Sequence, residues 1–260
     1  MAPNHLLEGK VALITGAASG FGEGIARLFA DEGAKIVVTD SGWQKVRLGR
    51  ATTAFSFIDY YDRTAEEIVA SGGKAVFAKT DITREEDWKK ALEIAKTEFG
   101  TVDILVNNAG WTYKKKDTLT VTEAEYDRVF DINVKSIFHS VNIILPHLIA
   151  QGSGSVVNIA SCITCKPTNG LMWYSATKAA VEVITRSLAR EYSGKGVRFN
   201  AVSPSISETP LMREFIGEEP STESLSSAAV EVPIGRLCTP LDIAKAALYF
   251  ASSYFNDFQT

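Results

Sequence analysis

The sequence is poor in cysteine and lacks any long apolar run. Its 260 residues include three cysteines, Cys162, Cys165 and Cys238, too few for a disulfide scaffold, so we expect a reducing, cytoplasmic environment. No apolar stretch approaches the ~20 residues that a membrane helix needs, and no membrane partner is expected. Residues 1–10 carry no apolar run behind a positive region, which argues against a signal peptide.

Positive charge is not in excess either. The chain has 27 Lys and Arg against 31 Asp and Glu, a formal net charge of −4. Without a broad basic field, nucleic acid is excluded as an expected partner. No Pro-rich or Gly/Ser-rich linker divides the chain, so we expect one domain over residues 1–260.

Short β-branched runs alternate with helical stretches. The expected strands are near-continuous apolar runs at 11–15, 35–39, 75–79, 104–107, 156–160 and 198–202. The expected helices are 22–32, 64–71, 84–99, 122–150, 172–192 and 241–251. This alternation predicts an α/β fold with a doubly wound parallel sheet. Segment 41–61, rich in Arg, Lys, Thr and aromatics, is longer than the connection requires, and 217–227 is expected to be a loop.

A glycine-rich turn follows the first expected strand and opens the first helix. It runs from Thr15 to Gly22 with glycines at 16, 20 and 22. Glycine lets the backbone approach a pyrophosphate closely, and the helix N-terminus offers N–H groups and partial positive charge. A purely structural turn is the alternative, but the strand–turn–helix context favours dinucleotide binding.

Asp40 ends the second expected strand. A carboxylate there can accept hydrogen bonds from the ribose hydroxyls of NAD and would repel the extra phosphate of NADP. We therefore expect NAD as the cofactor, with NADP disfavoured. Two alternatives stay open: Asp40 as a helix cap or loop acid, and Lys45, Arg47 and Arg50 as a source of positive charge for a phosphate.

Tyr174 and Lys178 lie four residues apart on an expected helix, hence on one face. A free tyrosine has a pKa near 10; a nearby ammonium and an oxidised nicotinamide would lower it, so Tyr174 could exchange a proton with an alcohol. Ser161 ends the strand 156–160, where a parallel sheet binds ligands, and could stabilise developing charge on the substrate oxygen. The alternatives are two surface residues of a helix and an N-cap serine.

Together these motifs resemble the short-chain dehydrogenase/reductase family, in its form with the Thr-Gly-x-x-x-Gly-x-Gly turn, over about residues 9–251. The resemblance implies a Rossmann-like single domain and a catalytic set of Asn133, Ser161, Tyr174 and Lys178. It implies that Asn133 holds a water in a proton relay to Lys178, and that Lys178 also binds the nicotinamide ribose.

The resemblance also implies the cofactor contacts, including Asp81 at the adenine and a motif over residues 107–110. They are Gly16, Ser19, Gly20, Phe21, Gly22, Asp40, Asp81, Ile82, Asn108, Ala109, Gly110, Tyr174, Lys178, Pro204, Ile206 and Thr209. No metal is expected, although Cys162 and Cys165 have redox or metal-site spacing.

The chain departs from the family pattern at three places. Ser205 stands where the family usually has glycine, and 41–61 forms an unusual insertion. The chain ends where the family continues into a last C-terminal strand, so we expect that strand to be lacking. A homodimer or homotetramer is expected if the C-terminus is complete.

The loops that border the family's substrate site carry apolar and aromatic residues: Trp111, Met172, Trp173, Met212 and Phe215. They predict an apolar or aromatic substrate, with ordinary packing in a mobile lid as the alternative. Lys114, Lys115 and Lys116 are either a solvated loop or a contact for an anionic substrate.

We therefore predict an NAD(H)-dependent oxidoreductase, a dehydrogenase or ketoreductase that moves a hydride between nicotinamide and a small alcohol or ketone. A non-catalytic dinucleotide-binding sensor or scaffold on the same fold is the main alternative. A dehydratase or epimerase that uses transient oxidation is the other.

Overall fold

The fold is built around one parallel sheet. A computed structural model describes residues 5–42, 62–230 and 232–254. Their sheet has six strands in the order β3-β2-β1-β4-β5-β6. The strands are β1 (Val11–Thr15), β2 (Lys35–Asp40), β3 (Lys74–Lys79), β4 (Ile104–Asn107), β5 (Gly154–Ile159) and β6 (Val197–Val202). The doubly wound α/β fold is confirmed, with strand order reversing between β1 and β4.

Two expectations fall outside the described residues. Nearly all of the 41–61 insertion does so, including Lys45, Arg47 and Arg50. The end of the chain after residue 254, on which the expectation of a lacking last strand rests, does so as well.

Both faces of the sheet are buried, which explains the uninterrupted apolar strands. In β1, Ala12 and Ile14 face one hydrophobic core, whereas Val11 and Leu13 face the other. Successive side chains of a strand point to opposite faces, so a strand covered on both sides needs apolar residues throughout.

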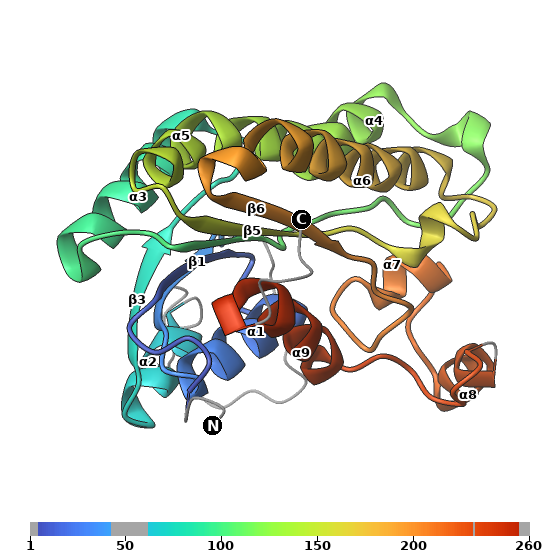
Figure 1. Ribbon diagram of the computed structural model, residues 1–260. Coiled ribbons are helices and arrows are strands. Elements are labelled where there is room, and N and C mark those ends of the chain that lie inside the picture. Colours follow the sequence, from blue (N-terminus) through green and yellow to red (C-terminus); the bar gives the residue numbers. More distant parts are fainter. Residues whose placement is uncertain (1–4, 43–61, 231, 255–260) are drawn as a thin grey trace.

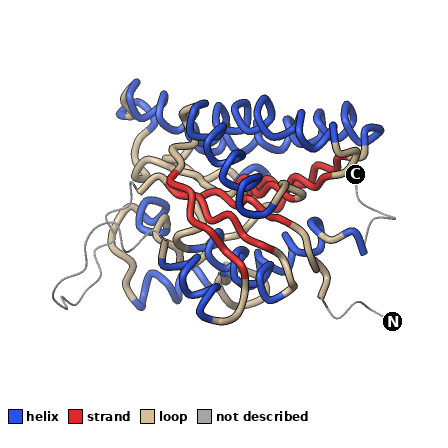
Figure 2. Tube along the Cα trace, turned by 90° about the vertical axis from the view of Figure 1, so that its left-hand side faces the viewer, coloured by secondary structure: helices blue, strands red, loops and turns tan. Residues whose placement is uncertain are grey.

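Helices cover the sheet in two layers (Figure 1; Figure 2 turns the view by 90°). One layer holds α1 (Gly20–Asp31), α2 (Arg63–Ala70) and α9 (Pro240–Ala251), and the other holds α3 (Glu85–Phe99), α5 (Ser136–Ala150) and α6 (Met172–Tyr192). In the described part of the chain, no helix combines the length and apolar character needed to cross a bilayer.

The single helix expected at 122–150 is interrupted. α4 (Glu123–Phe130) begins at a capping box made by Thr122 and Glu125 and leads into a π-helical turn, η2 (Asp131–Lys135), before α5. A π turn accommodates one extra residue and leaves the apolar periodicity nearly unchanged, so the sequence pattern does not reveal it. The turn places Asn133 toward the site described below.

Two short helices lie beyond the carboxyl end of β6: α7 (Met212–Ile216) and α8 (Thr222–Val230) (Figure 1). The loop expected at 217–227 is therefore wrong from Thr222 onward. The Ser221 hydroxyl accepts a hydrogen bond from the Ser224 N–H at 3.1 Å and starts the helix. No residue of α8 is buried, so the segment lacks the apolar stripe by which a helix is recognised in sequence.

Candidate active site

A cavity of about 2260 Å³ lies at the carboxyl edge of the sheet. Segments that follow each of the six strands contribute to its wall, as expected at the switch point of a doubly wound sheet. Every residue predicted for cofactor binding or catalysis lines this cavity, except Gly22 and Asn133. The fold thus brings together residues from position 16 to position 209.

The glycine turn at the end of β1 is tightly constrained. Gly16 and Gly20 have φ values of +63° and +59°, in the left-handed region that favours glycine. A Cβ on Gly22 would lie 2.2 Å from the Gly16 carbonyl oxygen. α1 begins at Gly20, directly after Ser19, so its first N–H groups are turned toward the cavity edge. This cradle fits a pyrophosphate.

Asn108 fastens the end of β4 to this turn. Its side-chain amide donates to the carbonyls of Thr15 and Gly16, at 2.8 and 3.2 Å. The N–H groups of Asn108 and Ala109 both donate to the Thr15 hydroxyl at 3.0 Å. The family's motif after the fourth strand therefore has a clear structural task here, holding the glycine turn in place.

The two predicted acids occupy different environments in the cavity wall. Asp40 is the last residue of β2, and its Oδ1 accepts from the Gly42 N–H at 3.1 Å. Burial raises the pKa of Asp40, opposed by backbone hydrogen bonds from Gly42, Ala18 and Ser41. Asp81 accepts at Oδ1 from the N–H and hydroxyl of Thr83, at 3.0 and 2.7 Å, so it also caps the turn that precedes α3.

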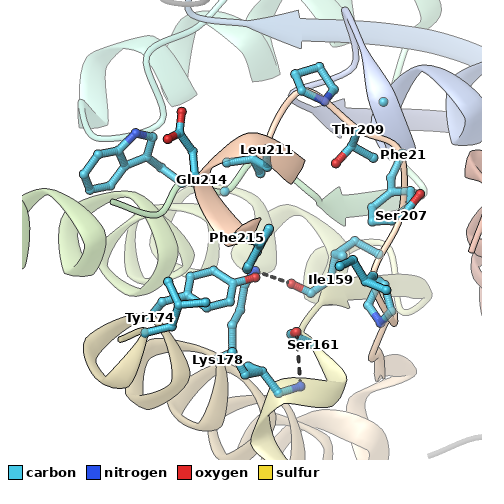
Figure 3. Close-up of a pocket in the computed structure, with 18 of the residues that line it drawn as sticks. Phe21, Ile159, Ser161, Tyr174, Lys178, Ser207, Thr209, Leu211, Glu214 and Phe215 are labelled. Atoms are coloured by element: carbon cyan, nitrogen blue, oxygen red, sulfur yellow. Dashed lines mark hydrogen bonds between the residues drawn. The ribbon is translucent and has the colours of Figure 1, made fainter. Parts of the chain in front are cut away.

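Tyr174 and Lys178 extend from one turn of α6 into the cavity (Figure 3). Both are buried, with 6% and 5% of their surface exposed. The Lys178 Nζ lies 5.8 Å from the centre of the Tyr174 ring and donates to the Ile159 carbonyl at 2.7 Å. The alternative of two surface residues is thereby excluded.

Burial dominates the proton affinities of this pair. It raises the pKa of Tyr174 above its usual range, while a hydrogen bond with Ser161 acts in the opposite direction. Burial also lowers the pKa of Lys178 to about 8. In the protein alone, burial of the phenol outweighs the hydrogen bond with Ser161. The lowering of the Tyr174 pKa expected from Lys178 together with an oxidised nicotinamide stays a prediction.

Ser161 follows β5 and precedes a 3-10 turn, η3 (Cys162–Thr164). Its Oγ accepts from the Ile163 N–H at 3.3 Å, so it is an N-cap. The next residue is fixed by a 3.0 Å hydrogen bond from the Cys162 N–H to the Pro204 carbonyl. The capping role and a substrate contact are compatible, since Ser161 also lines the cavity.

Asn133 in the π turn does not line the cavity but forms hydrogen bonds with residues that support its wall. Its Oδ1 accepts from the Trp111 N–H, and its Nδ2 donates to the Trp111 carbonyl, both at 2.9 Å. The same amide donates to the Thr177 hydroxyl at 3.0 Å, and Thr177 in turn donates to the Tyr174 carbonyl at 2.7 Å. Both amide protons of Asn133 are thus used within the protein. That Asn133 holds a relay water stays a prediction.

Thr177 was not predicted as a site residue. It is fully buried, and it connects the π turn to the backbone of Tyr174. Its position between Tyr174 and Lys178, three residues after the tyrosine, was the available signal, because residues three apart on a helix are neighbours.

Only part of the predicted apolar substrate wall is found. Trp111 and Phe215 line the cavity, and the Phe215 ring packs edge-on against Tyr174 at 5.1 Å (Figure 3). Met212 is 2% exposed and belongs to the interior, whereas Met172 is 44% exposed, and neither it nor Trp173 lines the cavity. The first turn of α6 carries successive side chains to different faces, so Tyr174 reaches the cavity and these two neighbours do not.

Cys162 and Cys165 are exposed free thiols in the cavity wall. Among the residues described, no group of three or more His, Cys, Asp or Glu side chains is arranged to hold a metal ion.

Lys114, Lys115 and Lys116 have different surroundings. The Lys116 Nζ pairs with Glu125 at 2.6 Å, and Lys114 is exposed and is not part of the wall. Lys115 alone of the three lines the cavity.

The residues present fit an extended dinucleotide. The glycine cradle and Asp40 lie in the same cavity wall as Tyr174 and Lys178, and a Cβ on Gly16 or Gly22 would crowd neighbouring atoms at 3.0 and 2.2 Å. The wall thus offers N–H groups for phosphates, a carboxylate for ribose hydroxyls, and a phenol with an ammonium.

Known proteins of similar sequence and structure are oxidoreductases. A family model described as enoyl-(acyl carrier protein) reductase matches residues 16–256. The chain is 39% identical over 246 residues to 4-formylbenzenesulfonate dehydrogenase of Comamonas testosteroni, covering 95% of this chain and 92% of that protein. It is 35% identical to cyclohexanol dehydrogenase of an Acinetobacter species, covering 94% and 88%.

A solved structure supports the same assignment. The 3-ketoacyl-(acyl-carrier-protein) reductase of Brucella melitensis, crystallised with NADH, superimposes with a TM-score of 0.83 at 35% identity and covers 97% of this chain and 94% of its own. The chain therefore belongs to the short-chain dehydrogenase/reductase family of NAD(P)-dependent oxidoreductases that act on CH–OH groups.

Proposed function

We propose that this protein is an NAD(H)-preferring dehydrogenase or reductase of a small alcohol or carbonyl compound, with Asn133, Ser161, Tyr174 and Lys178 as its catalytic set. The observation that carries the proposal is the burial of Tyr174 and Lys178 in the wall that also holds the glycine turn and Asp40. When bound, the cofactor supplies or accepts the hydride.

The side chains divide the remaining work. The Ser161 hydroxyl donates a hydrogen bond to the substrate oxygen and so stabilises negative charge that develops there. The Tyr174 hydroxyl gives that oxygen a proton during reduction and takes it back during oxidation. The Lys178 ammonium is held by the Ile159 carbonyl. When Lys178 is protonated, its positive charge favours the phenolate form of Tyr174. Asn133, besides the relay role proposed for it, positions the set together with Thr177, because both contact the backbones of Trp111 and Tyr174 directly or through one another.

Tyr174→Phe tests this assignment. We expect NADH consumption with a panel of ketones and aldehydes to fall at least 1,000-fold, while NADH binding, followed by fluorescence, stays within threefold. Tyr192→Phe, at the other end of α6 and outside the cavity wall, is the matched control and should retain full activity. Substantial turnover by Tyr174→Phe would refute the proposed role.

The preference for NAD over NADP is supported by Asp40. A carboxylate in this wall accepts from ribose hydroxyls and repels a 2′-phosphate. Asp40→Ala should lower kcat/KM with NADH at least tenfold and reduce the ratio of NADH to NADPH efficiency by more than that. Asp31→Ala, an exposed acid at the end of α1, is the control. A wild-type preference for NADPH would overturn this proposal.

The substrate is proposed to be a cyclic apolar or aromatic alcohol or carbonyl compound. Phe215 and Trp111 supply flat apolar surface beside Tyr174. Relatives are named for 4-formylbenzenesulfonate, cyclohexanol and cis-4-hydroxycyclohexanecarboxylate, all of them ring compounds. A panel of benzaldehydes, cyclohexanones and short acyclic ketones, followed at the NADH absorbance, should rank the ring compounds first.

We further propose that residues 1–260 form one catalytic domain, that it works in the cytoplasm, and that it associates as a homodimer or homotetramer. The three free cysteines and the net charge of −4 support the location and the absence of a nucleic-acid partner. The relatives are named as dehydrogenases, reductases and oxidoreductases, so nothing supports the non-catalytic alternative.

A further inference from the structure

The cavity wall holds two lysines that the proposed reaction does not use, Lys115 and Lys166, and the contacts of Lys115 single it out. Lys115 lies in the segment after β4, between Trp111 and the ion-paired Lys116. Within the described ranges, Lys115 has no ion pair, whereas the Lys116 ammonium contacts both carboxylate oxygens of Glu125 at 2.8 and 2.6 Å. A lysine that lines a cavity without pairing with a protein anion is available to a ligand anion.

Lys115 is held at the meeting point of three segments. Its N–H donates to the Glu214 carbonyl at 2.8 Å, which fixes it to α7. On the other side, a Cβ on Gly170 would lie 3.0 Å from the Lys115 Cγ, so this glycine admits the lysine stem. The Lys116 N–H donates to the Gly170 carbonyl at 3.3 Å and completes the junction. The backbone of Lys115 is therefore fixed, which limits where its ammonium can reach.

The same three segments carry the apolar wall. Trp111 precedes Lys115 in its own segment, Leu171 follows Gly170, and Phe215 follows Glu214. All three side chains line the cavity, and Phe215 contacts the ring of Tyr174 (Figure 3). The arrangement places the Lys115 side chain beside an apolar and aromatic surface that lies next to the proposed proton donor.

Several other charged side chains of the wall have partners within the protein. Glu214 accepts from the Arg213 Nε at 2.8 Å, and Asp131 pairs with Lys135 at 3.3 Å. The Arg128 guanidinium lies 4.5 Å from the centre of the Trp111 ring. Asp127 and Lys166 also line the cavity, and Lys166 is the competing cation that the experiment must separate from Lys115.

We propose that Lys115 binds an anionic group, a carboxylate or sulfonate, carried by a ring-containing substrate at the end opposite the reacting carbon. The proposal rests on the proposed function, since it concerns the same cavity. A charge-assisted hydrogen bond from an ammonium to a carboxylate or sulfonate is about twice as strong as a neutral one and orients a flat substrate along the wall.

The test compares a charged and an uncharged substrate of the same shape. With 4-carboxybenzaldehyde, Lys115→Met should raise KM at least tenfold and leave kcat within threefold. With benzaldehyde KM should stay within about twofold, so the KM ratio of the two substrates rises at least fivefold. Lys115→Arg, which keeps the charge, should restore the wild-type ratio within threefold. Lys114→Met, the matched loss of charge outside the wall, should leave both KM values unchanged.

A second measurement is independent of turnover. The redox-inert anion 4-methylbenzenesulfonate should bind the wild-type protein by calorimetry, and Lys115→Met should weaken the Kd at least tenfold while Lys114→Met leaves it unchanged. Equal effects of Lys115→Met on both aldehydes, or loss of anion binding in Lys166→Met in place of Lys115→Met, would overturn the proposal. Absence of turnover with intact Lys115-dependent anion binding would contradict the proposed function alone.

Discussion

At the scale of single residues, the site depends on burying an ammonium in a nonpolar wall. Lys178 is 5% exposed, and its ammonium donates a hydrogen bond to the Ile159 carbonyl. Its pKa falls to about 8 from the ordinary 10.5, because burial penalises the charged form. At 1.36 kcal/mol per unit, this difference costs about 3 kcal/mol of folding free energy at neutral pH.

Lys178→Met should therefore make the protein inactive and more stable. At pH 7 we expect the free energy of unfolding, measured by urea denaturation without cofactor, to rise by about 1–3 kcal/mol, allowing for the Ile159 carbonyl left unpaired. Folding lowers the pKa of Lys178 from 10.5 to about 8. The loss of wild-type stability that this causes is therefore complete below pH 8, shrinks between about pH 8 and 10.5, and vanishes above pH 10.5. The advantage of the variant should shrink over the same pH range. A destabilised variant at pH 7 would contradict this account.

The sequence predicted the residues whose roles follow from local spacing, and missed those that depend on distant partners. Tyr174 and Lys178 are one helical turn apart, and Ser161 ends a strand, so both placements follow from local rules. Which lysine of the triplet faces the cavity depends on Glu125 and Gly170, which come from two other segments. No short-range pattern contains that information.

At the scale of elements, the start of α1 is the most sterically restricted part of the site. The Cβ of an alanine at position 22 would lie 2.2 Å from the Gly16 carbonyl oxygen and 2.5 Å from the Asn108 Nδ2. Gly22→Ala should displace the glycine turn, lowering the melting temperature by several degrees and weakening NADH binding at least tenfold. Gly194→Ala, where an added Cβ meets nothing within 4 Å, is the control and should leave both unchanged. Wild-type NADH affinity in Gly22→Ala would show that the cradle is not a close-approach site.

Disruption of α8 should hardly affect stability, in contrast to Gly22→Ala, because no residue of α8 is buried. Leu225→Pro should break the helix but leave the global melting temperature within about 2 °C, since little buried surface is lost. Ser227 and Ala228 of α8 line the cavity, so KM for the substrate should rise severalfold. Ala247→Pro, in the buried α9, should abolish folding and provides the contrast. A large loss of melting temperature in Leu225→Pro would show that α8 contributes to the core.

Element boundaries were predictable where burial dictates the sequence. Each strand expected from an apolar run is found within about two residues, as are the helices that cover the sheet, apart from the start of α5 at Ser136. The π turn at Asp131–Lys135 and the helix α8 were missed for different physical reasons: the first hardly changes the apolar period, and the second has no apolar face.

At the scale of the whole molecule, the topology assembles the site. The strand order reverses between β1 and β4, so the segments after these strands diverge and leave room at the carboxyl edge of the sheet. The alternation of strands and helices was enough to predict this architecture, because right-handed crossovers leave few ways to wind a parallel sheet.

The helical layer that contains α3, α5 and α6 carries exposed apolar side chains on its outer surface. Phe138 on α5 is 62% exposed and Val183 on α6 is 53% exposed, on neighbouring helices of the same face (Figure 1). We predict that these two side chains lie in a contact between copies of the chain, where a twofold axis would pair this helix layer with its own copy. We therefore expect light scattering after gel filtration to give a multiple of the mass of one chain.

The double variant Phe138→Glu/Val183→Glu should dissociate the assembly to single chains, because four carboxylates would be buried without partners across a twofold contact. Val69→Glu is the matched control: Val69 is 52% exposed on α2, in the opposite layer, and its replacement should leave the mass unchanged. Circular dichroism of both variants should match the wild type, since all three side chains lie at the surface. A wild-type monomer, or equal dissociation by Val69→Glu, would place the contact elsewhere or exclude it.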